Sequence, residues 1–224
     1  MNGAFRTPLI VKNLLIINIL VFMAQELLPF GDQITRNLAL YYWESPNFGI
    51  WQYVTHMFCH GNLSHLFFNM FALWMFGRIL EYDLGSKRFL LFYMLSGIGA
   101  GILYSCVNWL EIQAIMSRAE TLAAITPGAA EKLWRLVNIP VVGASGAIYG
   151  VLLGFGMLHP NSVIMLMIPP IPLKAKYFVI IFMVLELFLG LRGGDGVAHF
   201  AHVTGMVSAF ILLKYWKAKG KIYY

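Results

Sequence analysis

Residues 141–150 read VVGASGAIYG, and this stretch predicts both how a helix packs and where a reactive side chain lies. Ser145 stands among small residues at the point where a loop becomes an apolar helix. Gly143 allows a close approach of the backbone there, and the first N–H groups of a helix lack partners inside the helix. A serine at this point has oxyanion donors nearby, as a nucleophile requires, although GxSG by itself is a weak motif.

The same helix carries a stripe of small residues that predicts its packing. Gly146, Gly150 and Gly154 recur every fourth residue, and such a stripe lets another membrane helix approach closely. Tyr149 lies one turn beyond Ser145 on the same face.

A second stretch, VAHFAHVTG at residues 197–205, offers the partner helix. His202 opens an apolar segment whose small face consists of Gly205, Ser208 and Ala209. If the two small faces meet, His202 comes within reach of Ser145 and can serve as the general base that a serine nucleophile needs. His199 is the alternative base, and we favour His202.

A third catalytic member is not evident from the sequence. Asp195, in GGDG, is better interpreted as a turn residue. Glu186 lies near the middle of an apolar segment, where it either pairs with a buried donor or is a protonated residue in helix packing, and we favour packing. The sequence therefore predicts a serine–histidine dyad.

A third stretch, THMFCHGNLSHLFFN at residues 55–69, concentrates polar side chains next to an apolar run. His65 and Asn69 are four residues apart, so on a helix their N–H donors share a face and could hold an oxyanion; the alternative is a polar pair that joins helices. We expect His56 and His60 to line a water-filled pocket. A zinc site of His56, His60 and His65 is disfavoured, because no HExxH motif or carboxylate base accompanies it. We expect no metal and no cofactor.

The composition places these segments in a membrane. Of the 224 residues, 59% are hydrophobic and 12% charged. An ordinary soluble domain has about a quarter charged residues, so lipid must cover much of this surface. The length suits one membrane domain, residues 1–224. The formal net charge is +6, and the basic residues cluster at the ends of apolar segments. This placement indicates anionic lipid headgroups as their partner and disfavours nucleic acid.

The hydropathy pattern predicts an all-α bundle of six transmembrane helices. The expected spans are residues 14–28, 63–80, 89–110, 145–158, 176–191 and 198–215. With a cytoplasmic N-terminus, 11 Lys and Arg residues fall inside and 5 outside, so both termini are expected in the cytoplasm. The first span is interpreted as an uncleaved signal anchor. The first outer loop, residues 29–62, is expected at the headgroup level. Residues 114–125 are expected to form a short helix that ends before Pro127.

In this arrangement the sequence resembles the rhomboid family of intramembrane serine proteases. The resemblance rests on WQYVTHMFCHGNLSHLFFN at 51–69, GASGAIYG at 143–150 and AHVTG at 201–205, in that order on the second, fourth and sixth spans. It implies Ser145 as nucleophile, His202 as base, and oxyanion donors from His65, Asn69 and the backbone N–H of Ser145. It also implies that Tyr149 packs against His202 and that His56 and His60 lie in a hydrated cavity.

The sequence departs from the family pattern at two loop positions. Gln52 follows Trp51 where the family has arginine, and Val142 precedes Gly143 where many relatives have a second glycine. Neither position touches the expected dyad.

The resemblance implies a serine endopeptidase that hydrolyses peptide bonds in or near transmembrane segments through an acyl-enzyme. Its partners would be transmembrane protein substrates and the lipid bilayer, and a bacterial cytoplasmic membrane is expected. One alternative is a non-catalytic rhomboid-like protein that binds membrane helices, although such relatives usually lack the serine or the histidine. The other is a small transporter with proton-relaying histidines, which should show inverted repeats that this sequence lacks.

Overall fold

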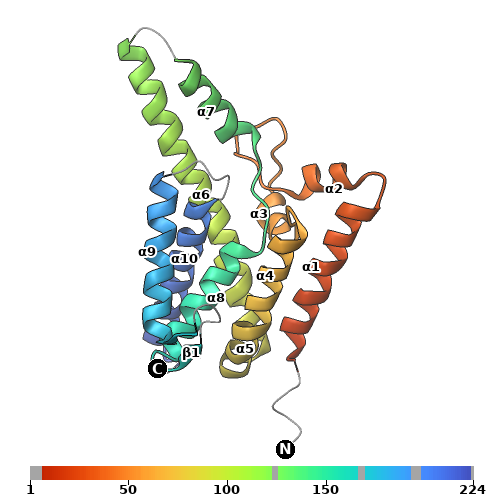
Figure 1. Ribbon diagram of the computed structural model, residues 1–224, viewed down its shortest axis with the longest axis vertical. Helices are drawn as coiled ribbons and strands as arrows, with labels where there is room; N and C mark the ends of the chain where they lie inside the picture. Colours follow the sequence, from red (N-terminus) through yellow and green to blue (C-terminus); the bar gives the residue numbers. More distant parts are fainter. Residues whose placement is uncertain (1–6, 123–125, 166–169, 193–197, 223–224) are drawn as a thin grey trace, which may run out of the picture.

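The computed structural model of the protein describes residues 7–122, 126–165, 170–192 and 198–222. Long helices run side by side and form most of the molecule (Figure 1). In chain order the elements are α1 Leu9–Leu27, α2 Gly31–Leu38, α3 Gln52–Thr55 with a 3₁₀ turn His56–Phe58, α4 Leu63–Ala72, a π-helical stretch Leu73–Gly77, α5 Arg78–Leu84, α6 Ser86–Leu122, α7 Pro127–Asn138, α8 Ser145–Leu158, β1 Val163–Met165, β2 Pro172–Lys174, α9 Ala175–Arg192 and α10 His199–Ala218.

Helix α8 lies inside the bundle, packed against α6 and α10. Small residues make this packing close. A Cβ added to Gly150 would lie 2.7 Å from the Cβ of Ser96 in α6 and 3.2 Å from the Cβ of Ala209 in α10. A Cβ added to Gly205 in α10 would overlap the carbonyl group of Gly146. The predicted contact between the small faces of the fourth and sixth spans is therefore observed.

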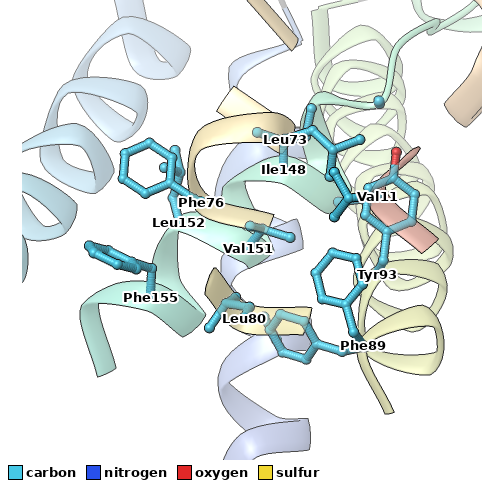
Figure 2. Packing of buried hydrophobic residues seen from close by; sticks show 14 of the residues in the cluster. Val11, Leu73, Phe76, Leu80, Phe89, Tyr93, Ile148, Val151, Leu152 and Phe155 are labelled. Carbon is cyan, nitrogen blue, oxygen red and sulfur yellow. The ribbon is translucent and has the colours of Figure 1, made fainter. Parts of the chain in front are cut away.

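Helix α4, the π-helical stretch and α5 follow one another without a break and form the second long helix, Leu63–Leu84. The hydrophobic core fills the space between α1, this second long helix, α6 and α8 (Figure 2). Its central side chains are fully or almost fully buried: Val11, Leu73, Phe76, Leu80, Phe89, Tyr93, Val151 and Phe155. Large apolar side chains are also exposed on the outward faces of the long helices, such as Leu20 in α1 and Phe188 in α9. Large apolar side chains exposed in this number suit contact with lipid.

Three helical segments in the described residues are long and apolar enough to cross a membrane by length and composition: Leu9–Leu27, Leu63–Leu84 and Ser86–Arg118. Helix α8 has only 14 residues and, as expected, is surrounded by other helices. Helices α9 and α10 have 18 and 20 residues. The start of α1 and the end of α10 lie at the same end of the bundle (Figure 1).

The expectation of a separate short helix at residues 114–125 is wrong over its described part. No proline interrupts residues 86–122, and α6 continues through them as one helix of 37 residues. At about 1.5 Å per residue it is about 55 Å long, so it is longer than the hydrocarbon core of a bilayer, which is about 30 Å thick. Helix α7 then begins at Pro127, where the Thr126 hydroxyl accepts a hydrogen bond from the Ala129 N–H at 3.3 Å.

A short antiparallel ribbon is the one described departure from an all-α fold. Strands β1 and β2 pair Val163 with Lys174, Ile164 with Leu173, and Met165 with Pro172. Proline cannot continue a helix and is tolerated at the first residue of a strand, which is where Pro172 lies. The ribbon lies between α8 and α9 in the chain, at the end of the bundle where α1 starts and α10 ends (Figure 1).

A buried carboxylate joins the start of α1 to the second long helix. The carboxylate of Glu81 accepts hydrogen bonds from the backbone N–H groups of Ile10 (3.0 Å) and Val11 (2.8 Å) and from the Ser86 hydroxyl (2.6 Å). The first N–H groups of a helix lack internal partners and favour a negative charge, so Glu81 caps α1 from another helix.

The loop at residues 29–62 is held together by Gln52, the residue that departs from the pattern of the family that the sequence resembles. Its amide accepts a hydrogen bond from the Tyr41 N–H at 3.2 Å and donates to the carbonyls of Asn47 (2.9 Å) and Asn37 (3.4 Å). Gln52 is 1% exposed, so its amide replaces solvent as the partner of these backbone groups.

This loop also supports the segment that precedes α8. Leu40 and Val141 exchange backbone hydrogen bonds of 2.9 and 2.8 Å as an isolated antiparallel bridge. Two residues further, the Gly143 N–H donates to the His56 carbonyl at 2.9 Å. The chain that enters α8 is therefore paired with the segment that connects α1 to α4.

Candidate active site

The structure brings the two predicted reactive side chains into contact. Ser145 is the first residue of α8 and His202 lies in the first turn of α10. His202 Nε2 lies 2.9 Å from Ser145 Oγ, a hydrogen-bond distance. The close α8–α10 packing at Gly146 and Gly205 accounts for this proximity, because bulkier residues would hold the helices apart.

The ring of His202 is fixed on its face as well as at its edges. Tyr149, one turn along α8, stacks on it with ring centroids 4.3 Å apart and an interplanar angle of 8°. The packing of Tyr149 against His202, expected from the family resemblance, is observed. The stack leaves the imidazole little freedom to turn away from Ser145.

Glu186 occupies a place that the sequence analysis did not assign to it. It is 7% exposed in α9, and one carboxylate oxygen, Oε2, lies 2.8 Å from His202 Nδ1 and 2.6 Å from His199 Nδ1. The other oxygen, Oε1, accepts a hydrogen bond from the Tyr149 hydroxyl. The favoured interpretation of Glu186 as a protonated packing residue does not fit these contacts, which match the alternative of a buried donor. His199 lies on this carboxylate rather than on Ser145.

The backbone of Gly143 lies between the Ser145 hydroxyl and the His65 ring of α4 and forms a wall of the site. Its φ of +125° strongly favours glycine. A Cβ there would lie 2.8 Å from His65 Nε2 and 3.5 Å from Ser145 Oγ. The His65 imidazole and the Ser145 hydroxyl thus flank the same backbone position.

The oxyanion donors predicted from the sequence lie on α4 and at the start of α8. Asn62 is the N-cap of helix α4, and its side-chain oxygen accepts a hydrogen bond from the His65 N–H at 2.8 Å. Asn69 is buried one turn beyond His65, and its Nδ2 donates to the His65 carbonyl at 3.0 Å. An amide nitrogen carries two donors, so one N–H of Asn69 is used inside the helix. The Ser145 N–H, at the start of α8, has no carbonyl one turn back within its helix.

The loop histidines are buried rather than open to the surface. His56 is 4% exposed, and its Nδ1 lies 2.7 Å from the Gln52 carbonyl. Burial lowers the pKa of His56 to about 4. His60 is 1% exposed and packs edge-on against the His65 ring, and burial together with His65 lowers its pKa to about 3. Both side chains are therefore neutral near pH 7; their lining of a hydrated pocket stays a prediction.

One set of side chains in the described residues has the composition and spacing of a metal site. Glu186, His199 and His202 offer ligand atoms that lie within 4.8 Å of one another. These residues differ from the set of His56, His60 and His65 that was weighed from the sequence. Hydrogen bonds between the carboxylate and the two imidazoles account for the same geometry.

The fold and these contacts define a class: a helical membrane protein with a serine–histidine contact between the starts of two closely packed helices. A family model described as the rhomboid domain matches residues 47–217. The chain therefore belongs to the rhomboid family.

Three relatives illustrate the similarity. Rhomboid-like protein 11, chloroplastic, of Arabidopsis thaliana is 30% identical over 138 residues, which cover 61% of this chain and 38% of that protein. Rhomboid protein 1, mitochondrial, of Saccharomyces cerevisiae is 38% identical over 116 residues, 51% of this chain and 27% of that protein. Rhomboid protease AarA of Providencia stuartii is 30% identical over 172 residues, 74% of this chain and 56% of that protein. The chain thus spans less than two thirds of each.

Sequence reasoning missed the link between Glu186 and His202. An ionisable residue in an apolar span is a functional candidate by default, and Glu186 was noticed for that reason. What the sequence lacks is the rotation of α9, which decides whether the carboxylate faces its neighbours α8 and α10 or the outside of the bundle. Two histidines near the start of the next helix were the available signal, since a buried carboxylate requires donors.

Proposed function

We propose that this chain is an intramembrane serine protease that hydrolyses peptide bonds in or near transmembrane segments of other membrane proteins. The observation that carries the proposal is the 2.9 Å contact between His202 Nε2 and Ser145 Oγ. A serine hydroxyl is a weak nucleophile until a base takes its proton, and histidine is the usual base. Membership in a family that includes proteins named rhomboid protease supports the same activity.

In the proposed reaction, His202 Nε2 takes the proton from Ser145 Oγ while Oγ attacks the scissile carbonyl carbon. The tetrahedral intermediate places its negative oxygen toward the Ser145 N–H, His65 and Asn69. The protonated His202 then donates its proton to the leaving amine, and an ester joins Ser145 to the acyl half of the substrate. Water, deprotonated by His202, attacks that ester and releases Ser145.

The proposed substrates are single-pass membrane proteins whose helix unwinds near its outer end. A peptide bond inside a helix is shielded by its own hydrogen bonds, so local unwinding is needed to present the carbonyl to Ser145. Peptide hydrolysis of this kind requires no metal or organic cofactor, because the base and the oxyanion donors come from side chains and backbone.

The proposed topology has six spans and a cytoplasmic location for both termini. Six helical segments of the described residues support it: α1, the continuous 63–84 segment, α6, the shorter α8, α9 and α10. The excess of 11 over 5 Lys and Arg residues favours the same orientation. A reporter enzyme fused to the C-terminus tests this topology, and reporter activity on the outer side would contradict it. The membrane we propose is the bacterial cytoplasmic membrane.

The activity is tested with the purified chain in detergent and a panel of single-pass transmembrane substrates. We expect cleavage by the parent and by Ser64→Ala, which removes an exposed serine in the first turn of α4. Ser145→Ala and His202→Ala should abolish cleavage. A non-catalytic protein that binds helices would retain the substrates without cleaving them. Cleavage by Ser145→Ala at the parent's rate would overturn the proposal.

The oxyanion assignment has its own test. Asn69→Ala should lower kcat by about 100- to 1,000-fold with little change in KM, because the interaction forms only as charge develops on the carbonyl oxygen. An unchanged kcat would remove Asn69 from the oxyanion site and leave the serine and histidine roles standing.

A further inference from the structure

Glu186 completes a continuous chain of contacts from α9 through α10 to α8. Its Oε2 lies 2.8 Å from His202 Nδ1, and the opposite ring nitrogen, Nε2, lies 2.9 Å from Ser145 Oγ. Carboxylate, imidazole and hydroxyl therefore follow one another through the two edges of the same ring. In a serine–histidine–acid triad the acid occupies this position.

The carboxylate determines which nitrogen of His202 can act as a base. An ionised carboxylate only accepts hydrogen bonds, so a ring nitrogen 2.8 Å from it carries the proton. In the neutral imidazole the proton then lies on Nδ1, and the lone pair on Nε2 faces the Ser145 hydroxyl. The other tautomer would present an N–H to Ser145 and could not take its proton.

The surroundings of Glu186 favour an ionised and immobile carboxylate. It is 7% exposed, and an isolated buried charge would be costly. Three groups that can donate hydrogen bonds converge on it: the Tyr149 hydroxyl on Oε1, and the Nδ1 atoms of His199 and His202 on Oε2. Tyr149 also stacks on the His202 ring, so this one side chain contacts both the Glu186 carboxylate and the imidazole and helps to fix their relative position. His199, three residues before His202 in the first turn of α10, offers the remaining nitrogen.

We propose that Glu186 is a positioning residue of the active site: it holds His202 as the Nδ1–H tautomer and stabilises the imidazolium formed when Ser145 gives up its proton. The proton passes from Ser145 Oγ to His202 Nε2, while the Nδ1 proton stays on the ring and Glu186 stays ionised. This inference rests on the proposed function for its catalytic consequence. Its structural part, the tautomer of His202, can be measured without activity.

The first measurement is of the tautomer. The full-length chain, labelled with ¹⁵N-histidine in detergent micelles, is examined by ¹⁵N NMR at pH 7.5, with the His202 signals assigned by their absence in His202→Gln. We expect a protonated Nδ1 and an unprotonated Nε2 in the parent. Glu186→Gln should yield a mixture of tautomers, and Glu186→Asp should largely keep the parent pattern. A parent spectrum with the proton on Nε2 would overturn the inference with no need for a variant.

The second measurement separates a positioning role from a purely structural one. Glu186→Gln should lower kcat on a transmembrane substrate by about 100- to 10,000-fold, with KM changed less than about threefold. Glu186→Asp should recover part of that loss. Tyr149→Phe, which removes only the donor to Oε1, should cost less than Glu186→Gln. A Glu186→Gln variant with the parent's kcat, or one that loses activity while His202 keeps its tautomer, would refute the role.

The two proposals fail in distinguishable ways. If the parent cleaves nothing in the substrate panel, the protease proposal fails, and the ¹⁵N spectrum still decides whether Glu186 holds His202. Spectra with and without EDTA test the metal interpretation of Glu186, His199 and His202. An Nδ1–H signal unaffected by EDTA supports the hydrogen-bonded arrangement. Its appearance only after EDTA treatment would mean that a metal ion occupies the carboxylate, and would overturn the inference.

Discussion

The contact between α8 and α10 predicts a large effect of a single methyl group. In Gly205→Ala, the new Cβ would lie 2.8 Å from the Gly146 carbonyl carbon and 3.1 Å from its Cα, and it would overlap the carbonyl oxygen. Carbon atoms pack at about 3.5 to 4.0 Å, so the helices must separate by about 1 Å. All three obstructing atoms belong to the backbone, which cannot change rotamer.

The separation acts directly on the reactive pair, because Gly146 follows Ser145 and Gly205 lies one turn beyond His202. A displacement of about 1 Å would stretch the 2.9 Å contact between Ser145 Oγ and His202 Nε2 beyond hydrogen-bond range. We expect the cleavage rate to fall at least about 100-fold and the free energy of unfolding to fall by about 1 to 3 kcal/mol.

The assay compares cleavage of a transmembrane substrate and thermal denaturation in the same detergent. Gly128→Ala is the matched control, since a Cβ there meets no atom within 4 Å, and it should leave both quantities near the parent's. A Gly205→Ala variant that cleaves within threefold of the parent would refute the reasoning that helix contact sets the distance between the pair.

Three further results are expected. Gly143→Ala would need a left-handed backbone at φ +125° and would press on His65, so we expect at least about a 100-fold loss of turnover; a rate near the parent's would contradict the wall described above. Because the pKa values of His56 and His60 are lowered to about 4 and about 3, below the ordinary 6.5, the unfolded state binds more protons in acid. Stability should be full above about pH 6.5 and fall toward pH 4 by about 1 kcal/mol per histidine per pH unit, and a denaturation midpoint unchanged from pH 7 to 4.5 would argue against their burial. Glu81→Gln replaces one acceptor by a donor opposite two backbone N–H groups, so unfolding should become easier by about 1 to 3 kcal/mol in denaturant titrations, whereas an unaltered midpoint would discount the cap.

Local patterns predicted the helices and the contact of the reactive pair well. The small faces around Gly146 and Gly205 meet, since only close packing makes use of glycine at that spacing. The end of α6 was not predictable in the same way. The polar residues near Glu111 and Arg118 suggested a loop, whereas a helix that leaves the membrane keeps its backbone hydrogen bonds and can be polar.

The parts of the site that sequence reasoning missed depend on tertiary geometry. The local sequence does not indicate that the Gln52 amide hydrogen-bonds to backbone groups of three loop residues. It also does not indicate that Glu186 contacts His202 of α10. Such side chains acquire their partners only when segments distant in sequence come together. Their residue types indicated that partners would be needed and did not indicate which.

The pairing of Leu40 with Val141, and of Gly143 with His56, has a consequence for how the protein tolerates different lipids. A bilayer of another thickness changes the tilt of membrane helices at a modest cost. These hydrogen bonds tie the segment that precedes Ser145 to the loop between α1 and α4, so we expect tilting of the long helices to move Ser145 less than a free loop would allow. Such an attachment would keep the Ser145 hydroxyl at a nearly constant depth in bilayers of different thickness.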